Sequence, residues 1–203
     1  MMPKVVPEYK EEAKKRIIRH ATKLLSAKGY SKTRMIDIAE SMGVSKGAIY
    51  QYFESKQELL LSVLETHADI RGREVSSLLD SGNITAISTE EFFDRMLSLR
   101  MGSLALTLDL LRDLATNSPA LKWIKESYES WAEGVSKMID DFKEEGVVKK
   151  EVDSESVARA ILALRDGLYG SLSLGSDVSK ARRTWVTVMG LLMNEILVNP
   201  NGA

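Results

Sequence analysis

Apolar residues recur every three or four positions along most of this chain, and the first such stretch runs over 8–27. There Ile17, Ala21 and Leu24 fall on one face of a helix, while charged residues fill the other face. Gly29 follows the stretch and tolerates the left-handed backbone that ends many helices. The pattern predicts an amphipathic helix that buries one side.

Further segments of this kind predict an all-α protein of about nine helices. Ser55 begins a capping box with Glu58, Asp153 can cap a later helix, and Pro119 suits a first helical turn. The segment over 80–88 reads as a loop, and no convincing strand is found, because Val147-Val148 is short and flanked by charge. The predicted helices cover 34–41, 46–52, 55–79, 89–115 with a bend near Gly102, 119–146, 153–174 and the stretch from 177 to 198.

The segment over 34–53 has the spacing of a helix-turn-helix. Such a motif needs a small side chain where its helices cross, and Ala39 provides one. Its turn needs a residue that accepts a left-handed backbone, and Gly43 does so. Ser45 can cap the second helix. An ordinary helical hairpin, in which the glycine only ends a helix, is the less favoured alternative. The small core of the motif would be formed by Ile38, Met42, Val44 and Ile49.

Residues 17–60 resemble the DNA-binding head of the TetR family of bacterial and archaeal regulators. This resemblance covers about a quarter of the chain and is highly specific. It implies a DNA-binding helix-turn-helix domain over 1–54 and a ligand-binding and dimerisation domain over 55–203. The pieces that match are Ala21–Leu25, Gly29-Tyr30, Thr33, Asp37–Ala39, Gly43–Gly47, Ile49–Phe53 and Ser55–Leu60.

The resemblance also implies the residues that contact DNA. The recognition helix would begin at Lys46, which by hydrogen-bond geometry could read guanine, and Gln51 could read adenine. Tyr50 would reach the sugar-phosphate backbone. Where the family often has a second Thr or Ser this chain has Arg34, which leaves the capping contact there open while keeping a cation for phosphate. The full expected set is Thr33, Arg34, Ser45, Lys46, Gly47, Ala48, Tyr50, Gln51, Tyr52 and Lys56. Phe53 and Tyr30 are expected to pack in the core instead.

The distribution of charge agrees with a polyanionic partner. Residues 1–60 carry 12 Lys and Arg against 7 Asp and Glu, whereas the whole chain has a net charge of −1. A basic head on an acidic body favours a head that meets nucleic acid. Scatter over a solvated surface would give the same count, so charge alone leaves both explanations open.

The last two predicted helices have the composition of a subunit interface. The helix over 153–174 carries small residues that allow close helix approach, among them Ala160, Ala163 and Gly167. The last helix is apolar around most of its circumference and therefore needs cover on more than one side. The family resemblance implies a homodimer through a four-helix interface. A monomeric core is the alternative.

An aromatic and methionine-rich region between these parts is expected to hold an effector pocket. Methionine and aromatic side chains suit an adaptable apolar pocket, although each one could simply fill the core. Arg165, Arg95 or Arg100 could meet an anionic ligand group or form a structural ion pair. We expect a small hydrophobic effector with a polar end, such as a fatty acid or acyl-CoA. The candidate pocket residues are Phe92, Phe93, Met96, Leu97, Met101, Leu104, Leu108, Trp123, Tyr128, Trp131, Arg165 and Tyr169.

Composition argues against several other classes of protein. The chain has no cysteine and two histidines, so thiolate and imidazole metal sites are not expected, nor is a cofactor. Common catalytic motifs such as HExxH, GxSxG and the P-loop are missing. No signal peptide and no apolar run of about 18 residues is found, so we expect a cytoplasmic protein. A helical ligand-binding or enzymatic protein that does not act on DNA remains the alternative.

Overall fold

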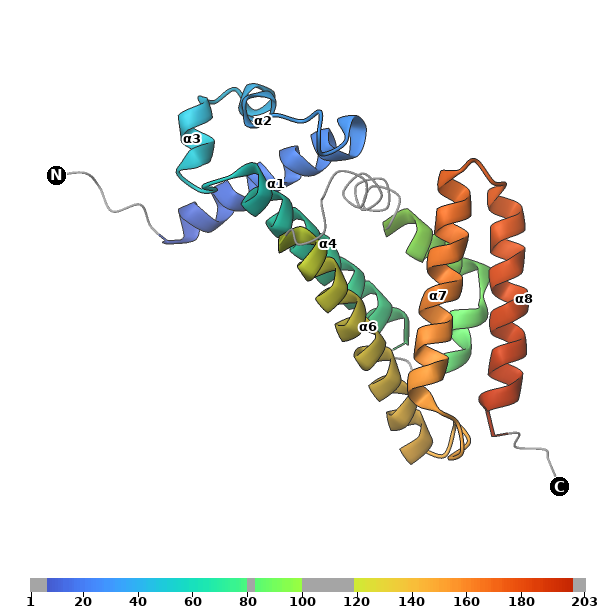
Figure 1. The fold of residues 1–203 in the computed structure, drawn as a ribbon. Helices are drawn as coiled ribbons and strands as arrows, with labels where there is room; N and C mark the ends of the chain where they lie inside the picture. The colour runs from blue at the N-terminus through green and yellow to red at the C-terminus, as the bar shows by residue number, and fades with distance from the viewer. Residues whose placement is uncertain (1–6, 80–82, 100–118, 199–203) are drawn as a thin grey trace. The chain divides into compact units, whose positions relative to one another are not determined.

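The structure, a computed structural model, describes residues 7–79, 83–99 and 119–198. This part of the chain is helical apart from short connections, which confirms the predicted all-α class (Figure 1). A helix also covers 90–99. The other elements are α1 (Pro7–Lys28), α2 (Met35–Met42), α3 (Lys46–Tyr50), α4 (Lys56–Leu79), the 3₁₀ helix η1 (Ile84–Ser88), α6 (Pro119–Glu144), α7 (Ser154–Ser173) and α8 (Val178–Ile196).

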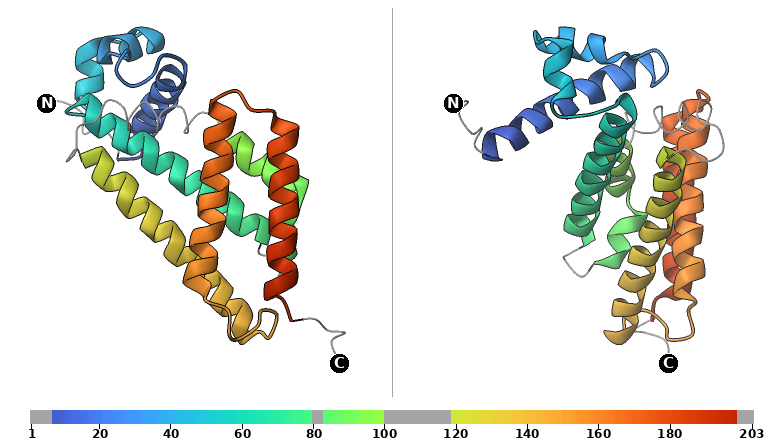
Figure 2. Two further views of the ribbon diagram at one scale, coloured as in Figure 1. Left: turned by 45° about the vertical axis from the view of Figure 1, so that its right-hand side comes forward. Right: turned by 60° about the vertical axis from the view of Figure 1, so that its left-hand side comes forward.

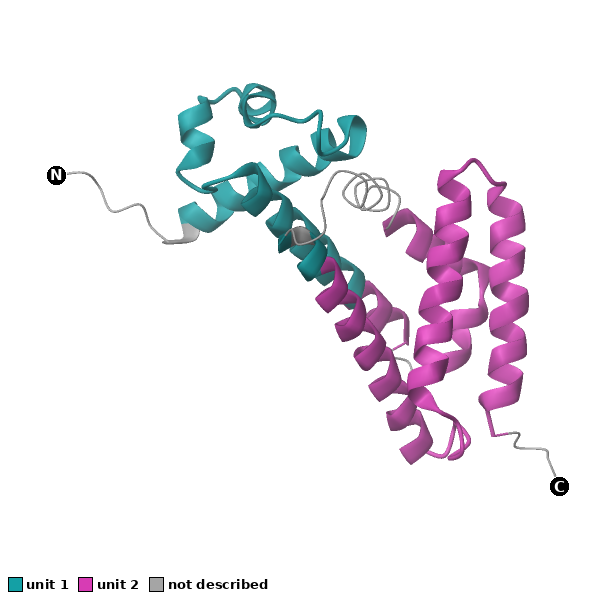
Figure 3. Cartoon of the chain, in the orientation of Figure 1, with its two compact units in different colours: residues 1–72, 101–123 teal, residues 73–100, 124–203 magenta. Residues whose placement is uncertain are grey.

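The chain divides into two compact units (Figure 3). Unit 1 comprises residues 1–72 and 101–123, and unit 2 comprises residues 73–100 and 124–203. Both α4 and α6 contribute residues to both units, so unit 1 contains more of the chain than the 1–54 expected for the DNA-binding domain. That functional boundary stays a prediction.

In unit 1 the predicted amphipathic pattern of α1 is confirmed. Ile17, Ala21 and Leu25 are buried on one face, and α2 packs against α1 while α3 packs against α2. Full burial of an aliphatic side chain stabilises a fold by about 1.5 to 3 kcal/mol. Gly29 ends α1 with a φ of 79°. The long helix α1 and the short helices α2 and α3 are therefore held by a shared apolar core.

In unit 2, α7 and α8 run side by side in opposite directions, joined by a short turn at 174–177 (Figures 1 and 2). The buried face of α8 packs on η1 as well as on α7. Trp185 is the main anchor: its indole Nε1 donates a hydrogen bond to the Ile87 carbonyl at 2.8 Å, and its ring stacks on Phe92 with centroids 6.1 Å apart.

Two features of unit 2 go beyond the predicted helices. The predicted loop over 80–88 is wrong for 84–88, which form η1 and bury Ile84 and Ile87, while Asn83 caps the turn by accepting from the Thr85 backbone N–H. The prediction that Val147-Val148 is not a strand is confirmed, although Val148 forms an isolated antiparallel bridge with Leu197. Both features depend on contacts with α8, which a local pattern does not reveal.

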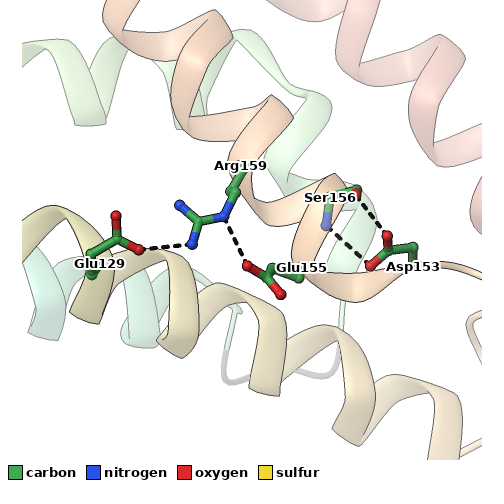
Figure 4. A network of polar contacts seen from close by, with 5 residues as sticks. All are labelled: Glu129, Asp153, Glu155, Ser156 and Arg159. Atoms are coloured by element: carbon green, nitrogen blue, oxygen red, sulfur yellow. Dashed lines mark hydrogen bonds and ion pairs between the residues drawn. The ribbon is translucent and has the colours of Figure 1, made fainter.

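An ion-pair network joins α6 to α7 (Figure 4). Arg159 donates to Glu129 on α6 at 2.7 Å and to Glu155 on α7 at 3.0 Å, and these hydrogen bonds raise the pKa of its guanidinium. Asp153 caps α7 as predicted, and the hydrogen bonds from Ser156 lower the pKa of its carboxyl. Since these groups are exposed, the network contributes little to the free energy of folding, and its main effect is on how α6 and α7 are oriented.

No helix among the described residues is long and apolar enough to cross a membrane. Within the same residues, no three His, Cys, Asp or Glu side chains come together as they would around a metal ion.

Candidate functional site

The turn between α2 and α3 has the predicted left-handed residue. Gly43 has a φ of 68°, and the turn closes when the Val44 backbone N–H donates to the Ala39 carbonyl at 3.1 Å. A residue with a Cβ would cost about 1 to 2 kcal/mol in this conformation. Glycine therefore sets the direction in which α3 leaves α2.

The start and the inner face of α3 are as expected. The Ser45 hydroxyl caps α3 by accepting from the Ala48 backbone N–H at 3.2 Å. Ile38, Ala39 and Ile49 form the fully buried core of the motif, and Met42 is half-buried. The prediction is wrong for Val44, which is 37% exposed because only its backbone takes part in closing the turn.

The outer face of α3 is polar and accessible. Lys46, Gly47 and Gln51 are exposed, and Tyr50 is 41% exposed. The Lys46 ammonium lies 5.4 Å from the centroid of the Tyr50 ring, so the two side chains support each other. Ala48 and Tyr52 are half-buried. This face presents a cation, an amide and a phenol side by side.

Thr33 and Arg34 lie in the turn before α2. The Thr33 side chain is fully buried, and its hydroxyl donates to the Gly29 carbonyl at 2.7 Å, so that hydroxyl serves the fold of the head. The Arg34 guanidinium is exposed and pairs with Asp37 at 2.8 Å, and the hydrogen bond lowers the pKa of the Asp37 carboxyl. Asp37 also accepts from the Arg34 backbone N–H at 2.9 Å. Asp37 therefore caps the start of α2, and the Arg34 side chain makes no capping hydrogen bond.

Lys56, at the start of α4, has an internal role that sequence reasoning missed. Its ammonium donates to the backbone carbonyls of Tyr30 at 2.9 Å and Thr33 at 3.1 Å, and it lies 4.1 Å from the centroid of the Tyr30 ring. Tyr30 packs as expected, and burial raises the pKa of its phenol. Lys56 thus ties α4 to the turn between α1 and α2.

The capping box before α4 is only partly as predicted. The Glu58 backbone N–H donates to the Ser55 hydroxyl at 3.0 Å, as a capping box requires. The Glu58 carboxylate, however, accepts from the backbone N–H of Glu54 rather than that of Ser55. Phe53 is buried just before this cap, as expected. The end of α3 and the start of α4 are therefore held in a fixed connection.

Comparison with known proteins agrees with this geometry. Residues 17–63, which span the whole helix-turn-helix, match the family described as bacterial regulatory proteins, tetR family. The head of this chain, over 17–63, therefore matches the TetR family. An HTH-type transcriptional regulator of Bacillus subtilis, YfiR, is 25% identical over 186 residues, or 89% of each chain.

Solved structures share the fold beyond the head. A TetR transcriptional regulator from Chloroflexus aurantiacus aligns over 95% of this chain and 100% of its own, with a TM-score of 0.75 and 21% identity. A structure from Saccharomonospora viridis in complex with choline aligns over 93% of this chain and 100% of its own, with a TM-score of 0.70 and 22% identity. At these identities the likeness concerns the fold.

Unit 2 contains a cavity that is lined almost wholly by apolar side chains. Small-molecule sites are typically concave and apolar, with a few polar groups that orient the ligand. Six of the predicted residues lie on its wall: Phe92, Phe93, Met96, Trp131, Arg165 and Tyr169. Eight more described residues line it: Val75, Leu79, Ile87, Val135, Met138, Ile161, Leu162 and Trp185.

The remaining predicted pocket residues lie elsewhere. Trp123 and Tyr128 are on α6 but not on this wall, and Leu97 is half-buried and does not line it. Met101, Leu104, Leu108 and Arg100 lie outside the described residues. Trp185 was missed because the apolar pattern of α8 assigned that helix to an interface. Arg95 pairs with Glu74 at the surface, so it does not enter the cavity.

Replacing Lys56 by alanine should destabilise the head, because two backbone carbonyls lose their charged donor. Loss of such hydrogen bonds costs about 1 to 3 kcal/mol. Lys46→Ala is the matched control, since Lys46 is exposed and contacts only the Tyr50 ring. Urea denaturation followed by circular dichroism measures both. Equal stability of the two variants would contradict the internal role of Lys56.

Proposed function

We propose that this TetR-family transcriptional regulator binds a palindromic DNA operator as a homodimer and represses transcription until a small hydrophobic effector, of the fatty acid or acyl-CoA class, releases it. The observation that carries the proposal is the exposed outer face of α3, held by the Gly43 turn and the Ser45 cap. The apolar cavity in unit 2 supports the sensor role.

The outer face of α3 has the donors that reading bases requires. Lys46 can donate to the guanine O6 and N7 atoms, and Gln51 can bond adenine N6 and N7 in the major groove. The hydroxyls of Tyr50 and Tyr52 reach sugar and phosphate, where contacts set position rather than sequence preference. Arg34 adds an exposed cation beside this face, although Asp37 partly neutralises it. The buried Thr33 hydroxyl and the engaged Lys56 ammonium contribute indirectly, by holding the head together.

We expect specific, salt-sensitive binding to the DNA upstream of this protein's own gene. The affinity should fall by about 0.9 log units per neutralised phosphate for each log unit of salt. Tyr50→Phe should weaken binding to all sequences, whereas Gln51→Ala should change base preference at one position by about 1 to 3 kcal/mol. Fluorescence anisotropy across a salt series measures these effects.

Scrambled DNA of equal length and the variant Tyr128→Phe, on α6, are the controls. If a random-sequence selection finds no preferred site, the DNA-binding proposal fails. The alternative of a helical ligand-binding or enzymatic protein that does not act on DNA would then be favoured.

The outer faces of α7 and α8 support a dimer. On α7 the exposed residues Ala160, Ala163 and Gly167 form a stripe of small side chains, and on α8 Leu191 is 67% exposed. A Cβ built on Gly167 meets no atom within 4 Å, so packing within one chain does not require glycine there. Glycine inside a helix costs about 0.5 to 1 kcal/mol relative to alanine. Close approach of a second subunit would account for the stripe.

Gly167→Leu should therefore separate the dimer without unfolding the chain. Light scattering after size-exclusion chromatography should show a monomer, and affinity for a palindromic operator should drop about 100-fold because the two half-sites are no longer bound together. The matched control is Gly134→Leu, a mid-helix glycine on α6 that also has no atom within 4 Å of a built Cβ. A Gly167→Leu protein that remains dimeric would rule out this interface.

Helix α4 offers a route from the cavity to the head. Its first residue, Lys56, bonds the carbonyls of the α1–α2 turn, and Val75 and Leu79 near its other end line the cavity. An effector that contacts this end would shift α4 and with it the spacing of the two heads in a dimer. Release requires that the effector bind the DNA-incompetent spacing more tightly.

The effector should change the distance between the two heads. The chain has no cysteine, so Lys23→Cys, at an exposed position on α1, places a single spin label on each protomer. Double electron–electron resonance then measures the head-to-head distance with and without an effector that releases DNA. An unchanged distance distribution would contradict the lever mechanism.

A further inference from the structure

Arg165 on α7 is a buried cation in the wall of the apolar cavity. The residue is 8% exposed, and its guanidinium carbon lies 5.8 Å from the centroid of the Trp131 ring. Its Nε donates to Asp166 at 3.0 Å. Among the described residues, neither terminal nitrogen of the guanidinium makes a hydrogen bond.

Within the part of the chain that the structure describes, most of the hydrogen-bonding capacity of Arg165 is unused. A guanidinium has five N–H donors, and the bond to Asp166 uses one of them. Buried donors without acceptors are costly, and a buried charge is more costly still unless it is paired. The bond to Asp166 lies on the Nε side, so the edge formed by the two terminal nitrogens remains available for a bidentate acceptor.

Building on the proposed sensor role of this cavity, we propose that the effector is an amphipathic monocarboxylate, whose carboxylate is bound by the terminal nitrogens of Arg165 and whose apolar body lies against the aromatic wall. Arg165 is the only charged residue among the described wall residues. The wall otherwise consists of aliphatic and aromatic side chains such as Phe92, Phe93 and Trp185. A ligand with one acidic group and an apolar remainder matches that composition.

The same composition separates the two effector classes considered above. The head group of an acyl-CoA carries several phosphate charges, which need several cationic or N–H partners. The described wall offers one cation, which matches the single negative charge of a free acid. The aromatic side chains alone would suit a quaternary ammonium ion. A buried guanidinium among them repels a cation and favours an anion.

The competing explanation is that Arg165 serves only as the partner of Asp166. The two explanations differ in what Asp166 does to ligand binding. If Arg165 binds a carboxylate, Asp166 competes with the ligand, and neutralising it by Asp166→Asn should leave carboxylate affinity unchanged or raise it. If the pair is purely structural, neither Asp166→Asn nor a substitution of Arg165 should change the affinity for an acid relative to that for an alcohol.

The experiment compares three probes of equal chain length on the full-length protein: decanoate, 1-decanol and decyltrimethylammonium. Trp131 and Trp185 lie on the cavity wall, so quenching of tryptophan fluorescence and isothermal titration calorimetry both report binding. Wild type should bind decanoate most tightly. Arg165→Gln should weaken decanoate binding by about 10- to 100-fold and change decanol binding by about 2-fold or less.

Arg95→Gln is the matched control, because Arg95 belongs to the same unit but pairs with Glu74 at the surface. It should leave all three affinities unchanged. Arg165→Lys keeps the charge and loses the planar fork, so it should recover only part of the decanoate affinity. Thermal melts of every variant separate loss of binding from loss of fold, and Asp166→Asn gives a second reading if Arg165→Gln melts early.

The outcomes separate this inference from the proposed function. A decanoate preference that disappears in Arg165→Gln supports the inference. Equal binding of acid and alcohol, tighter binding of the ammonium probe, or a preference that survives in Arg165→Gln overturns it while leaving the cavity as a sensor site. If no probe binds wild type, both the inference and the sensor role fail, whereas DNA binding is judged by its own assay.

Discussion

The left-handed turn at Gly43 is the constraint on which the DNA-binding head depends. Helix α3 has five residues, and a helix that short is not stable in water by itself. It persists because the turn directs it onto α2, Ile49 is buried beneath it, and Ser45 caps its first turn. A polar surface of Lys46, Tyr50 and Gln51 is thus presented by an element that its surroundings, rather than its own propensity, hold in place.

Lysine and arginine play three different roles in this protein, and burial decides which. Lys46 is exposed and available to a partner, whereas the ammonium of Lys56 donates hydrogen bonds to two backbone carbonyls inside the head. Arg165 is buried in a nearly apolar wall, where its Nε pairs with Asp166 and its terminal nitrogens bond none of the described residues. Buried N–H donors without acceptors cost free energy, so an acceptor supplied by a ligand would stabilise them.

Among the described residues, the outer face of α3 and the outer faces of α7 and α8 are both exposed but differ in character. The outer face of α3 is polar and rich in donors, as a nucleic-acid surface is, whereas the faces of α7 and α8 are small and apolar, as a subunit interface is. The family match over 17–63 bears on the first face alone. The case for the second depends on the physical argument that glycine inside a helix lowers its stability, while packing within the described chain does not require Gly167.

The sequence by itself determined the class of fold, the helix-turn-helix and its family, because these depend on short-range signals: apolar periodicity, the glycine in the turn, and hydroxyl or carboxylate caps such as Ser45 and Asp153. It also placed six residues of the cavity wall, since aromatic and methionine residues mark apolar interiors. Only the tertiary structure decided which cation does what. Lys46, Lys56 and Arg165 are all cations in the sequence. They differ in burial and in their partners, and for Lys56 one partner lies 26 positions away along the chain. The same reason explains the 3₁₀ helix over 84–88 and the bridge at Val148, which form where α8 supplies the packing surface or the partner backbone.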